Sequence, residues 1–348
     1  MRRFTTLLFA FATTSVFTHF AAGQASVTTI PVGFNTSAIP AAASASAPSN
    51  TVISAPFYAV AVFQGVVSSV DTASQLSVSG ANFTSLLTTP PYLARLKTGP
   101  SAGRFFIVTG QTATQLTLDT ATAGYTLTTG APSNTQAQVA VGDSVEVLPA
   151  NTLGTLFGTG TVPFQPGASA NAADNVYLFN GGWEVYFHNG SSWRKTGSFS
   201  SQNNTVVLPD RGMFIIRRAT TPLNLTFLGT VPSTTERTDF AGPASSFKSN
   251  RFPVNMTLGG TGPSALNLQN LPNWLTGASA QGADNLYLWD GTGWAVYFHN
   301  GTSWRKTGSF SSQDTTVVPL GSSMFVIRQS TATGSTATLV QSTLPYTL

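Results

Sequence analysis

The sequence predicts an all-β protein, in which an N-terminal small antiparallel barrel or sandwich is followed by two tandem β-meander or sandwich repeats. Three observations predict it. The segment NVYLFNGGWEVYFHNGSSWRKTGSFSSQ at 175–202 returns almost unchanged at 285–313. Short runs rich in Val, Phe, Tyr, Thr and Leu are bounded by Gly, Pro, Ser, Asn or Asp. No stretch shows the periodicity of an amphipathic helix. A repeat of about 110 residues is too long for a solenoid unit, so each copy is a small domain or half of one.

Composition excludes several classes of protein. Only 8% of the 348 residues are charged, and the formal net charge of +4 includes Arg2 and Arg3 at the extreme N-terminus. No basic patch of the kind that binds nucleic acid is predicted. The chain has no cysteine, so it has neither disulfides nor thiol chemistry, and its core alone must hold it together.

The first 25 residues have the pattern of a signal peptide. Arg2 and Arg3 form a basic start, an apolar stretch runs from Leu7 to Phe17, and the small-residue segment 23–25 predicts cleavage after Ala25. The apolar stretch is shorter than the roughly 20 residues that a membrane-spanning helix needs. We therefore expect an exported protein, secreted, periplasmic or at the cell surface, with no transmembrane span in the mature chain.

The expected domains follow in order. Residues 26–50 are rich in Ala, Ser and Pro and are predicted to be a linker. Residues 51–148 contain seven β-like runs, among them FYAVAVFQGVVSSV and GRFFIVTG, and form the N-terminal β module. Repeat 1 spans 149–252, including a joint, and repeat 2 spans 253–348. The copies end in the strands MFIIRR (213–218) and MFVIRQ (324–329), each followed by a closing strand.

Turn signals predict the register of a three-strand meander in each repeat. Asn180-Gly181 and Asn189-Gly190 favour two-residue hairpin turns, because type I′ turns need positive φ at both central residues. These turns would pair Leu178 with Trp183 and Tyr186 with Trp193. In repeat 2 the turn Asp290-Gly291-Thr292 is one residue longer, and we expect a bulge to absorb it, so that Leu288 still meets Trp294.

Alternation then assigns two faces to each meander. The predicted core face holds Val176, Leu178, Trp183, Val185 and Phe187 in repeat 1, and Leu286, Leu288, Trp294, Val296 and Phe298 in repeat 2. The other face is aromatic with polar tips. Its candidate ligand-binding residues are Tyr177, Tyr186, His188, Trp193, Lys195, Tyr287, Trp289, Tyr297, His299, Trp304 and Lys306.

Two interpretations of this aromatic face remain open. It could be a stacking platform, since Tyr and Trp present flat apolar rings with hydrogen-bonding edges, as sugars and protein partners require. Alternatively it packs against a second sheet of the same domain. We favour packing, because two-layer β domains need both layers.

Catalytic and metal-binding patterns are not found in the sequence. His188 and His299 lie beside hairpin turns without a partner spacing for zinc, and no Asp-rich loop suits calcium. Asp174 and Asp284 recur in equivalent Ala-Asp-Asn segments, where we expect strand-starting Asx-turns. The cations Arg194-Lys195 and Arg305-Lys306, with Arg217 and Arg328, could contact an acidic polysaccharide or a lipopolysaccharide phosphate, or could be solvated strand ends. No catalytic residue, metal or cofactor is predicted.

Several segments resemble an uncharacterised family of exported β-rich bacterial proteins found in Verrucomicrobia and relatives. They are VFQGVVSSV (62–70), SAGRFFIVTG (101–110), GDSVEVLPANTLGTLFG (142–158), DNVYLFNGGW and MFIIRR. The resemblance spans most of the mature chain. It implies no assigned activity and no functional residues.

The first functional hypothesis is a non-enzymatic protein with a structural, adhesive or partner-binding role at the cell surface, in which self-association is allowed. The second is a carbohydrate-binding module that uses its aromatic hairpin faces. A glycan hydrolase or lyase is third, and would need two carboxylates in one cleft. Glycans or other surface proteins are the expected partners.

Overall fold

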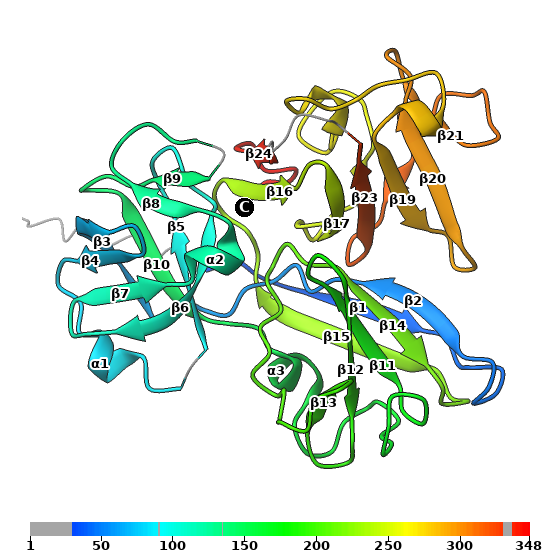
Figure 1. Cartoon of the computed structure of the whole chain (residues 1–348), viewed down its shortest axis with the longest axis horizontal. Helices are drawn as coiled ribbons and strands as arrows, with labels where there is room; N and C mark the ends of the chain where they lie inside the picture. The colour runs from blue at the N-terminus through cyan, green and yellow to red at the C-terminus, as the bar shows by residue number, and fades with distance from the viewer. Residues whose placement is uncertain (1–29, 90, 134, 330–335) are drawn as a thin grey trace, which may run out of the picture. The chain divides into compact units, whose positions relative to one another are not determined.

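The computed structural model describes residues 30–89, 91–133, 135–329 and 336–348 (Figure 1). The predicted signal peptide, 1–25, lies outside the described residues. Almost all regular structure is strand, and the helices are single turns: α1 (Phe83–Leu86), α2 (Thr120–Ala123), α3 (Leu153–Phe157), and the 3-10 turns η1 (Leu268–Asn270) and η2 (Ala280–Gly282). The prediction of an all-β fold is confirmed.

The N-terminal module is a closed six-stranded barrel in the order β10-β3-β4-β7-β6-β5. Its core consists of alternate apolar residues, among them Val67, Leu76, Phe106 and Leu116, which are all buried. A small parallel pair, β8 with β9, lies in the same module. The strands are β3 (Phe63–Thr72), β4 (Gln75–Val78), β5 (Tyr92–Leu96), β6 (Phe105–Gln111), β7 (Gln115–Leu118), β8 (Thr126–Thr128), β9 (Gln136–Gln138) and β10 (Ser144–Pro149).

Repeat 1 contains a five-stranded antiparallel sheet, β13-β12-β11-β14-β2, and a two-stranded ribbon, β1-β15. Its core includes Val176, Tyr186, Trp193, Met213 and Phe227. The strands are β1 (Val32–Ile39), β2 (Ser49–Ile53), β11 (Asn175–Phe179), β12 (Trp183–His188), β13 (Trp193–Lys195), β14 (Met213–Arg217) and β15 (Leu223–Thr230).

Repeat 2 has the same plan, with the sheet β17-β23-β19-β20-β21 and the ribbon β16-β24, and adds a short pair, β18-β22. The strands are β16 (Glu236–Phe240), β17 (Ala244–Ser249), β18 (Met256–Thr257), β19 (Asn285–Trp289), β20 (Trp294–His299), β21 (Trp304–Lys306), β22 (Val317–Val318), β23 (Ser323–Arg328) and β24 (Ala337–Gln341). Each repeat therefore begins with the ribbon strand and the sheet-edge strand that precede its meander.

This equivalence makes the barrel an insertion within repeat 1. The edge strand β2 pairs with β14 as β17 pairs with β23, and each edge strand leads into a buried phenylalanine, Phe57 or Phe252. From Phe252 the chain reaches β18 directly, whereas the barrel lies between Phe57 and α3. Asn151 Nδ2 donates to the Phe57 carbonyl at 3.1 Å, so the two ends of the insertion are adjacent.

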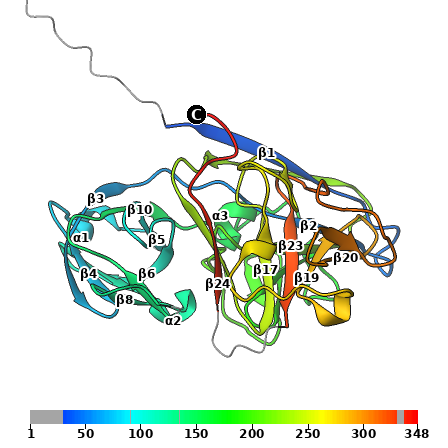
Figure 2. The same cartoon turned by 90° about the horizontal axis from the view of Figure 1, so that it is seen from above.

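The predicted linker over 26–50 differs from the structure. Residues 32–39 and 49–53 are β1 and β2, which pair with β15 and β14; Figures 1 and 2 draw these N-terminal strands beside the green strands of repeat 1. Residues 236–249, assigned to a joint, are β16 and β17 of repeat 2. Their small Ser, Thr and Ala side chains hide the strand pattern, but backbone pairing to distant strands does not need large side chains.

The predicted register is off by one residue between β11 and β12. Phe179 pairs with Trp183 and Leu178 with Glu184, across the three-residue turn 180–182. The next turn is longer than predicted, and His188 pairs with Trp193. Here Asn189 Oδ1 accepts from the amides of Ser191 and Ser192, so a side chain closes the turn.

A one-residue slip exchanges the two faces of a strand, so the face assignment is wrong for β12. Val176 and Leu178 share the core face with Tyr186, His188 and Trp193, while Trp183, Val185 and Phe187 lie on the other face. Repeat 2 shows the same correction, because Trp289 rather than Leu288 pairs with Trp294. The extra residue of its turn leaves the strands in equivalent register, as expected.

Buried aspartates anchor the last sheet strand of each repeat. Asp174 Oδ2 accepts from Arg217 Nη1 at 2.8 Å, and Asp284 Oδ2 from Arg328 Nε at 3.4 Å; all four side chains are buried. Asp284 also accepts from the amide of Gln329 at 2.6 Å. The two aspartates therefore do not form the expected Asx-turns, and Arg217 and Arg328 are not the solvated strand ends that were the alternative. Each aspartate instead forms an internal ion pair with its arginine.

We expect Asp284→Asn to lower the free energy of unfolding by about 3 to 5 kcal/mol, because it leaves Arg328 buried without its carboxylate. Urea unfolding followed by tryptophan fluorescence measures this. Asp314→Asn is the matched control, since Asn203 fills the equivalent position in repeat 1 and makes the same 2.8 Å bond to a tryptophan amide. Equal effects of the two substitutions would contradict the anchoring role.

Candidate functional site

Most of the predicted aromatic face lies inside the repeats. Trp193 and Trp304 are 0% exposed, and Tyr186 and Tyr297 are also buried. Trp193 Nε1 donates to the Gly158 carbonyl at 2.8 Å, and Trp304 Nε1 to Gln269 Oε1 at 3.0 Å. These four rings present no open face on which a sugar could stack, as the packing interpretation expects.

The two histidines support the turns that follow them. His188 Nδ1 accepts from the Gly190 amide at 3.2 Å, and His299 Nδ1 from the Gly301 amide at 3.1 Å. Each ring also packs edge-on against the tryptophan opposite, Trp193 or Trp304. Burial lowers the pKa of His299, and the nearby carboxylate of Asp314 opposes this only in part. Both histidines therefore accept a turn amide through Nδ1, and His188 Nε2 donates to the Thr159 carbonyl at 3.2 Å.

Of the remaining aromatic candidates, Trp289 contacts the other repeat, whereas Tyr177 and Tyr287 contact rings of their own repeat. Tyr177 and Trp289 belong to the face that also carries Trp183, Trp294 and the sheet phenylalanines Phe214 and Phe325. Trp183 of repeat 1 stacks on Phe325 of repeat 2 with ring centres 5.8 Å apart, and Trp294 stacks on Phe214 at 6.1 Å. Tyr287 contacts Phe325 within repeat 2.

These contacts are symmetric. Phe179 meets Phe325 at 5.2 Å, and its equivalent Trp289 meets Phe214 at 5.5 Å. Such exchange of equivalent partners is the pattern of an isologous interface, here formed within one chain. Each aromatic pair adds about 0.5 to 1.5 kcal/mol beyond the burial of its area, so the exchanged rings hold the repeats together.

The candidate lysines differ between the copies. Lys195 Nζ lies 2.6 Å from Glu184 Oε1. In repeat 2 Ala295 replaces that glutamate, and no acidic side chain of the described chain lies within ion-pair distance of Lys306. The charge of Lys306 acts at longer range, on Asp290.

Charged residues gather where the barrel meets repeat 2. Glu236 is fully buried and bonds to three groups: Arg95 of the barrel, Arg251 of repeat 2 and the Tyr58 hydroxyl, which donates at 2.8 Å. Arg95 also reaches Glu146 at 3.0 Å. Burial raises the pKa of Tyr58, so this hydroxyl remains a donor. The network compensates each buried charge with a partner from another segment.

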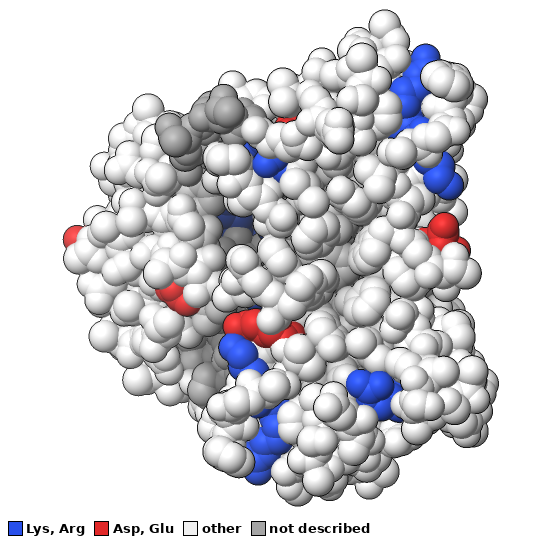
Figure 3. Space-filling view, turned by 45° about the vertical axis from the view of Figure 1, so that its right-hand side comes forward, with Lys and Arg blue, Asp and Glu red and all other residues white. Residues whose placement is uncertain are grey.

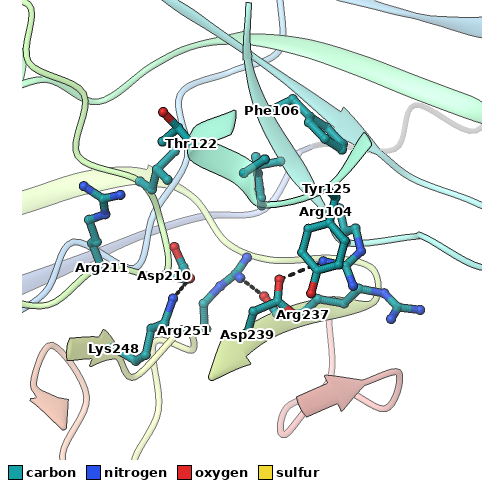
Figure 4. A pocket seen from close by; sticks show the side chains of 14 residues that line it. Arg104, Phe106, Thr122, Tyr125, Asp210, Arg211, Arg237, Asp239, Lys248 and Arg251 are labelled. Atoms are coloured by element: carbon teal, nitrogen blue, oxygen red, sulfur yellow. Dashed lines mark hydrogen bonds and ion pairs between the residues drawn. The ribbon is translucent and has the colours of Figure 1, made fainter. Parts of the chain in front are cut away.

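A cavity of about 110 Å³ adjoins this junction (Figure 4). Figure 4 shows Lys248 bonded to Asp210 and Arg104 bonded to Asp239, at 2.6 and 2.7 Å. Burial would raise the pKa of Asp210, but the ammonium of Lys248 and the guanidinium of Arg251 outweigh it and lower that pKa to about 2. Because these charges have partners, we interpret the cluster as a connection between modules.

A larger cavity of about 470 Å³ opens on the surface of repeat 2, between η2, the β20–β21 turn and the loop after β21. We call it the Phe310 pocket. Phe298 forms part of its floor, Arg305 is the cross-strand partner of Phe298, and Phe310 is 98% exposed. Its lining is Ala278, Ser279, Ala280, Phe298, Asn300, Arg305, Lys306, Thr307, Gly308, Ser309 and Phe310.

All eleven lining residues recur in repeat 1. They are Ala168, Ser169, Ala170, Phe187, Asn189, Arg194, Lys195, Thr196, Gly197, Ser198 and Phe199, which we call the Phe199 surface. Phe199 is 98% exposed, as Phe310 is. In each copy the arginine, Arg194 or Arg305, donates through Nη1 to the carbonyl of the exposed phenylalanine.

Sequence reasoning included Arg194, Lys195, Arg305 and Lys306 but missed the two phenylalanines. Loops carry no hydrophobic periodicity, so a single aromatic residue in one gives no pattern. The available signal was the letter-for-letter identity of WRKTGSFSSQ in both copies. Figure 3 shows how little of the visible face is charged.

No group of three or more His, Asp or Glu side chains suited to a metal was found among the residues that the structure describes. Within the same residues, no helix has the length and apolarity to cross a membrane. No family model, no curated protein and no solved structure matches this chain.

We expect Phe214→Ala combined with Phe325→Ala to uncouple the repeats, because it removes both rings on which the opposite tryptophans stack. Calorimetry should show the main unfolding transition split in two, with a loss of roughly 2 kcal/mol or more. Phe34→Ala, at a ring 71% exposed on β1, is the control. A single transition at the original temperature would refute this role.

Asp210 predicts a dependence of stability on pH. Its lowered pKa stabilises the fold fully above the unfolded value near 4, and this contribution is lost as pH falls toward 2. We expect Asp210→Asn to be less stable than the original protein by about 2 kcal/mol at pH 6. Denaturant titrations of both proteins should converge near pH 2. Curves that stay parallel would exclude this ion pair as the cause.

Proposed function

We propose that the chain is an exported, non-enzymatic β-protein with a structural, adhesive or partner-binding role at the cell surface, and that it binds through two equivalent surfaces. One observation carries the proposal. Every residue that lines the Phe310 pocket has an identical counterpart in repeat 1, and both copies hold a phenylalanine 98% exposed. Exposed rings of this kind, on an ordered loop, are typical of contact sites.

Divergence elsewhere supports this interpretation. Glu184 is replaced by Ala295 on the strand before the turn, and Phe179 by Trp289 on the first strand of the meander. Apart from Phe187 and Phe298, which line these surfaces, the other aromatic residues of the meander pack in the core or in the cluster between the repeats. Phe199 and Phe310 contribute to neither, so packing gives no reason for their retention.

The two surfaces lie far apart on the molecule. In Figure 1 β13 lies at the bottom and β21 at the upper right, at opposite ends of the pair of repeats. A protein with two separated copies of one site can bridge two partners or two points of a polymer, and gains avidity from doing so. Bridging is the property that adhesion and surface architecture require.

The other hypotheses have less support. A sugar platform built on Tyr186, Trp193, Tyr297 and Trp304 needs open rings, and these are buried. Hydrolysis of glycans needs two carboxylates in one accessible cleft. Glu146 and Glu236 do lie near each other, but both bond to Arg95 and both are buried.

Agglutination tests the proposal directly. We expect the mature protein to sediment with fixed cells of its source organism and to clump them. Phe199→Ser or Phe310→Ser alone should leave cell binding but lower the agglutination titre at least about tenfold, because one site cannot bridge. The double variant should lose both, while Phe34→Ser should change neither. Absence of sedimentation, or full clumping by the double variant, would overturn the proposal.

A further inference from the structure

We propose that the Phe310 pocket and the Phe199 surface each bind an acidic polysaccharide: a sugar ring stacks on the exposed phenylalanine and its carboxylate meets the adjacent arginine. This inference rests on the proposed function and names the ligand class of the same two surfaces. It is distinct from the buried aromatic face considered from the sequence.

The exposed ring projects from a loop whose backbone is ordered. Phe310 O accepts from Arg305, the Ser309 amide donates to the Lys306 carbonyl at 2.9 Å, and the hydroxyls of Ser309 and Ser311 lie 2.9 Å apart. No described residue makes a ring contact with Phe310. Preorganisation lowers the entropy lost on binding, and a flat apolar ring suits the C–H face of a pyranose.

Arg305 supplies the charge. Arg305 lies on the same face of the sheet as Phe298, because the two residues are cross-strand partners. No carboxylate among the described residues lies within ion-pair distance of Arg305. A guanidinium has five N–H donors in a fixed fork, and the bond to Phe310 O uses one of them. The others match a carboxylate bidentately, and no acidic residue lines the pocket to oppose an anion.

The rest of the wall suits hydroxyl groups. Ser279, Thr307 and Ser309 carry hydroxyls, and Asn300 carries an amide whose Oδ1 already accepts from the Ser303 amide at 2.9 Å. Small-molecule sites of this size combine a few placed polar groups with apolar surface. A neutral partner would leave the guanidinium of Arg305 without an opposite charge. A lipid bilayer could not contact both surfaces at once, because they lie at opposite ends of the repeats in Figure 1.

Both copies keep the groups that this recognition uses. Phe199 and Arg194 of repeat 1 match Phe310 and Arg305 of repeat 2, with the same bond from the arginine to the phenylalanine carbonyl. Alternation places the adjacent lysine of each copy on the opposite face of its strand from the arginine, so the lysine acts only through the local potential. We therefore expect both surfaces to bind the acidic chain.

Calorimetric titration of the mature protein with a galacturonic acid tetramer, and with the neutral galactose tetramer, tests this. We expect two sites for the acidic tetramer, with affinity that falls as salt rises. Phe310→Ser should weaken one of the two sites on the order of tenfold. Arg305→Gln should remove the preference of that site for the acidic over the neutral tetramer.

Phe34→Ser is the matched control, since it removes an exposed ring on β1, which is part of neither surface. Unchanged thermal midpoints show that the variants are folded. No binding, equal binding of both tetramers, or binding that Phe310→Ser leaves unchanged would overturn the inference, as would Phe310-dependent binding to anionic lipid vesicles alone. If cells still agglutinate in those cases, the proposed function stands with another ligand; if they do not, both fail.

Discussion

The burial of Glu236 constrains the whole arrangement. A carboxylate without water must be matched by hydrogen bonds and opposite charge, and its partners come from three segments: Tyr58 at the start of the barrel insertion, Arg95 within it, and Arg251 of repeat 2. All five residues of β5 are buried as a result, since one face packs into the barrel and the other meets this network. Only 8% of the residues in this chain are charged. The cluster of charged residues around Glu236 therefore fixes how the barrel and repeat 2 connect.

Alternation and turn composition were enough to predict the strands of the meander, but not their register. The predicted two-residue turns assume that the backbone closes the loop, whereas the side chain of Asn189 does so and lengthens the turn. The slip of one residue that moved Trp183 to the interface and Tyr186 to the core arises in the preceding turn, 180–182, which has three residues rather than two. The identity of the strands is a local property, whereas register depends on hydrogen bonds that the letters do not specify.

The boundaries of the repeats could not be predicted from the aromatic block. β1 and β2 consist largely of small and polar residues, and their partners are about 160 to 200 residues further along the chain, beyond any local pattern. Only the cations of the candidate surfaces could be predicted from the sequence, because the repeated Arg-Lys pairs carry charge. The phenylalanine beside each pair lies in a loop, and only its 98% exposure in the structure indicates a contact site.

The position of the barrel between Phe57 and Asn151 has a consequence for the order in which the chain folds. β1 and β2 are synthesised first, but β14 and β15, to which they pair, follow only after the complete barrel. The barrel's own strands pair over shorter stretches of the sequence than β1 and β2 do, which favours their earlier pairing. We therefore expect repeat 1 to close after its insert, and until then the unpaired edges of β1 and β2 are open to aggregation or to capture by a chaperone.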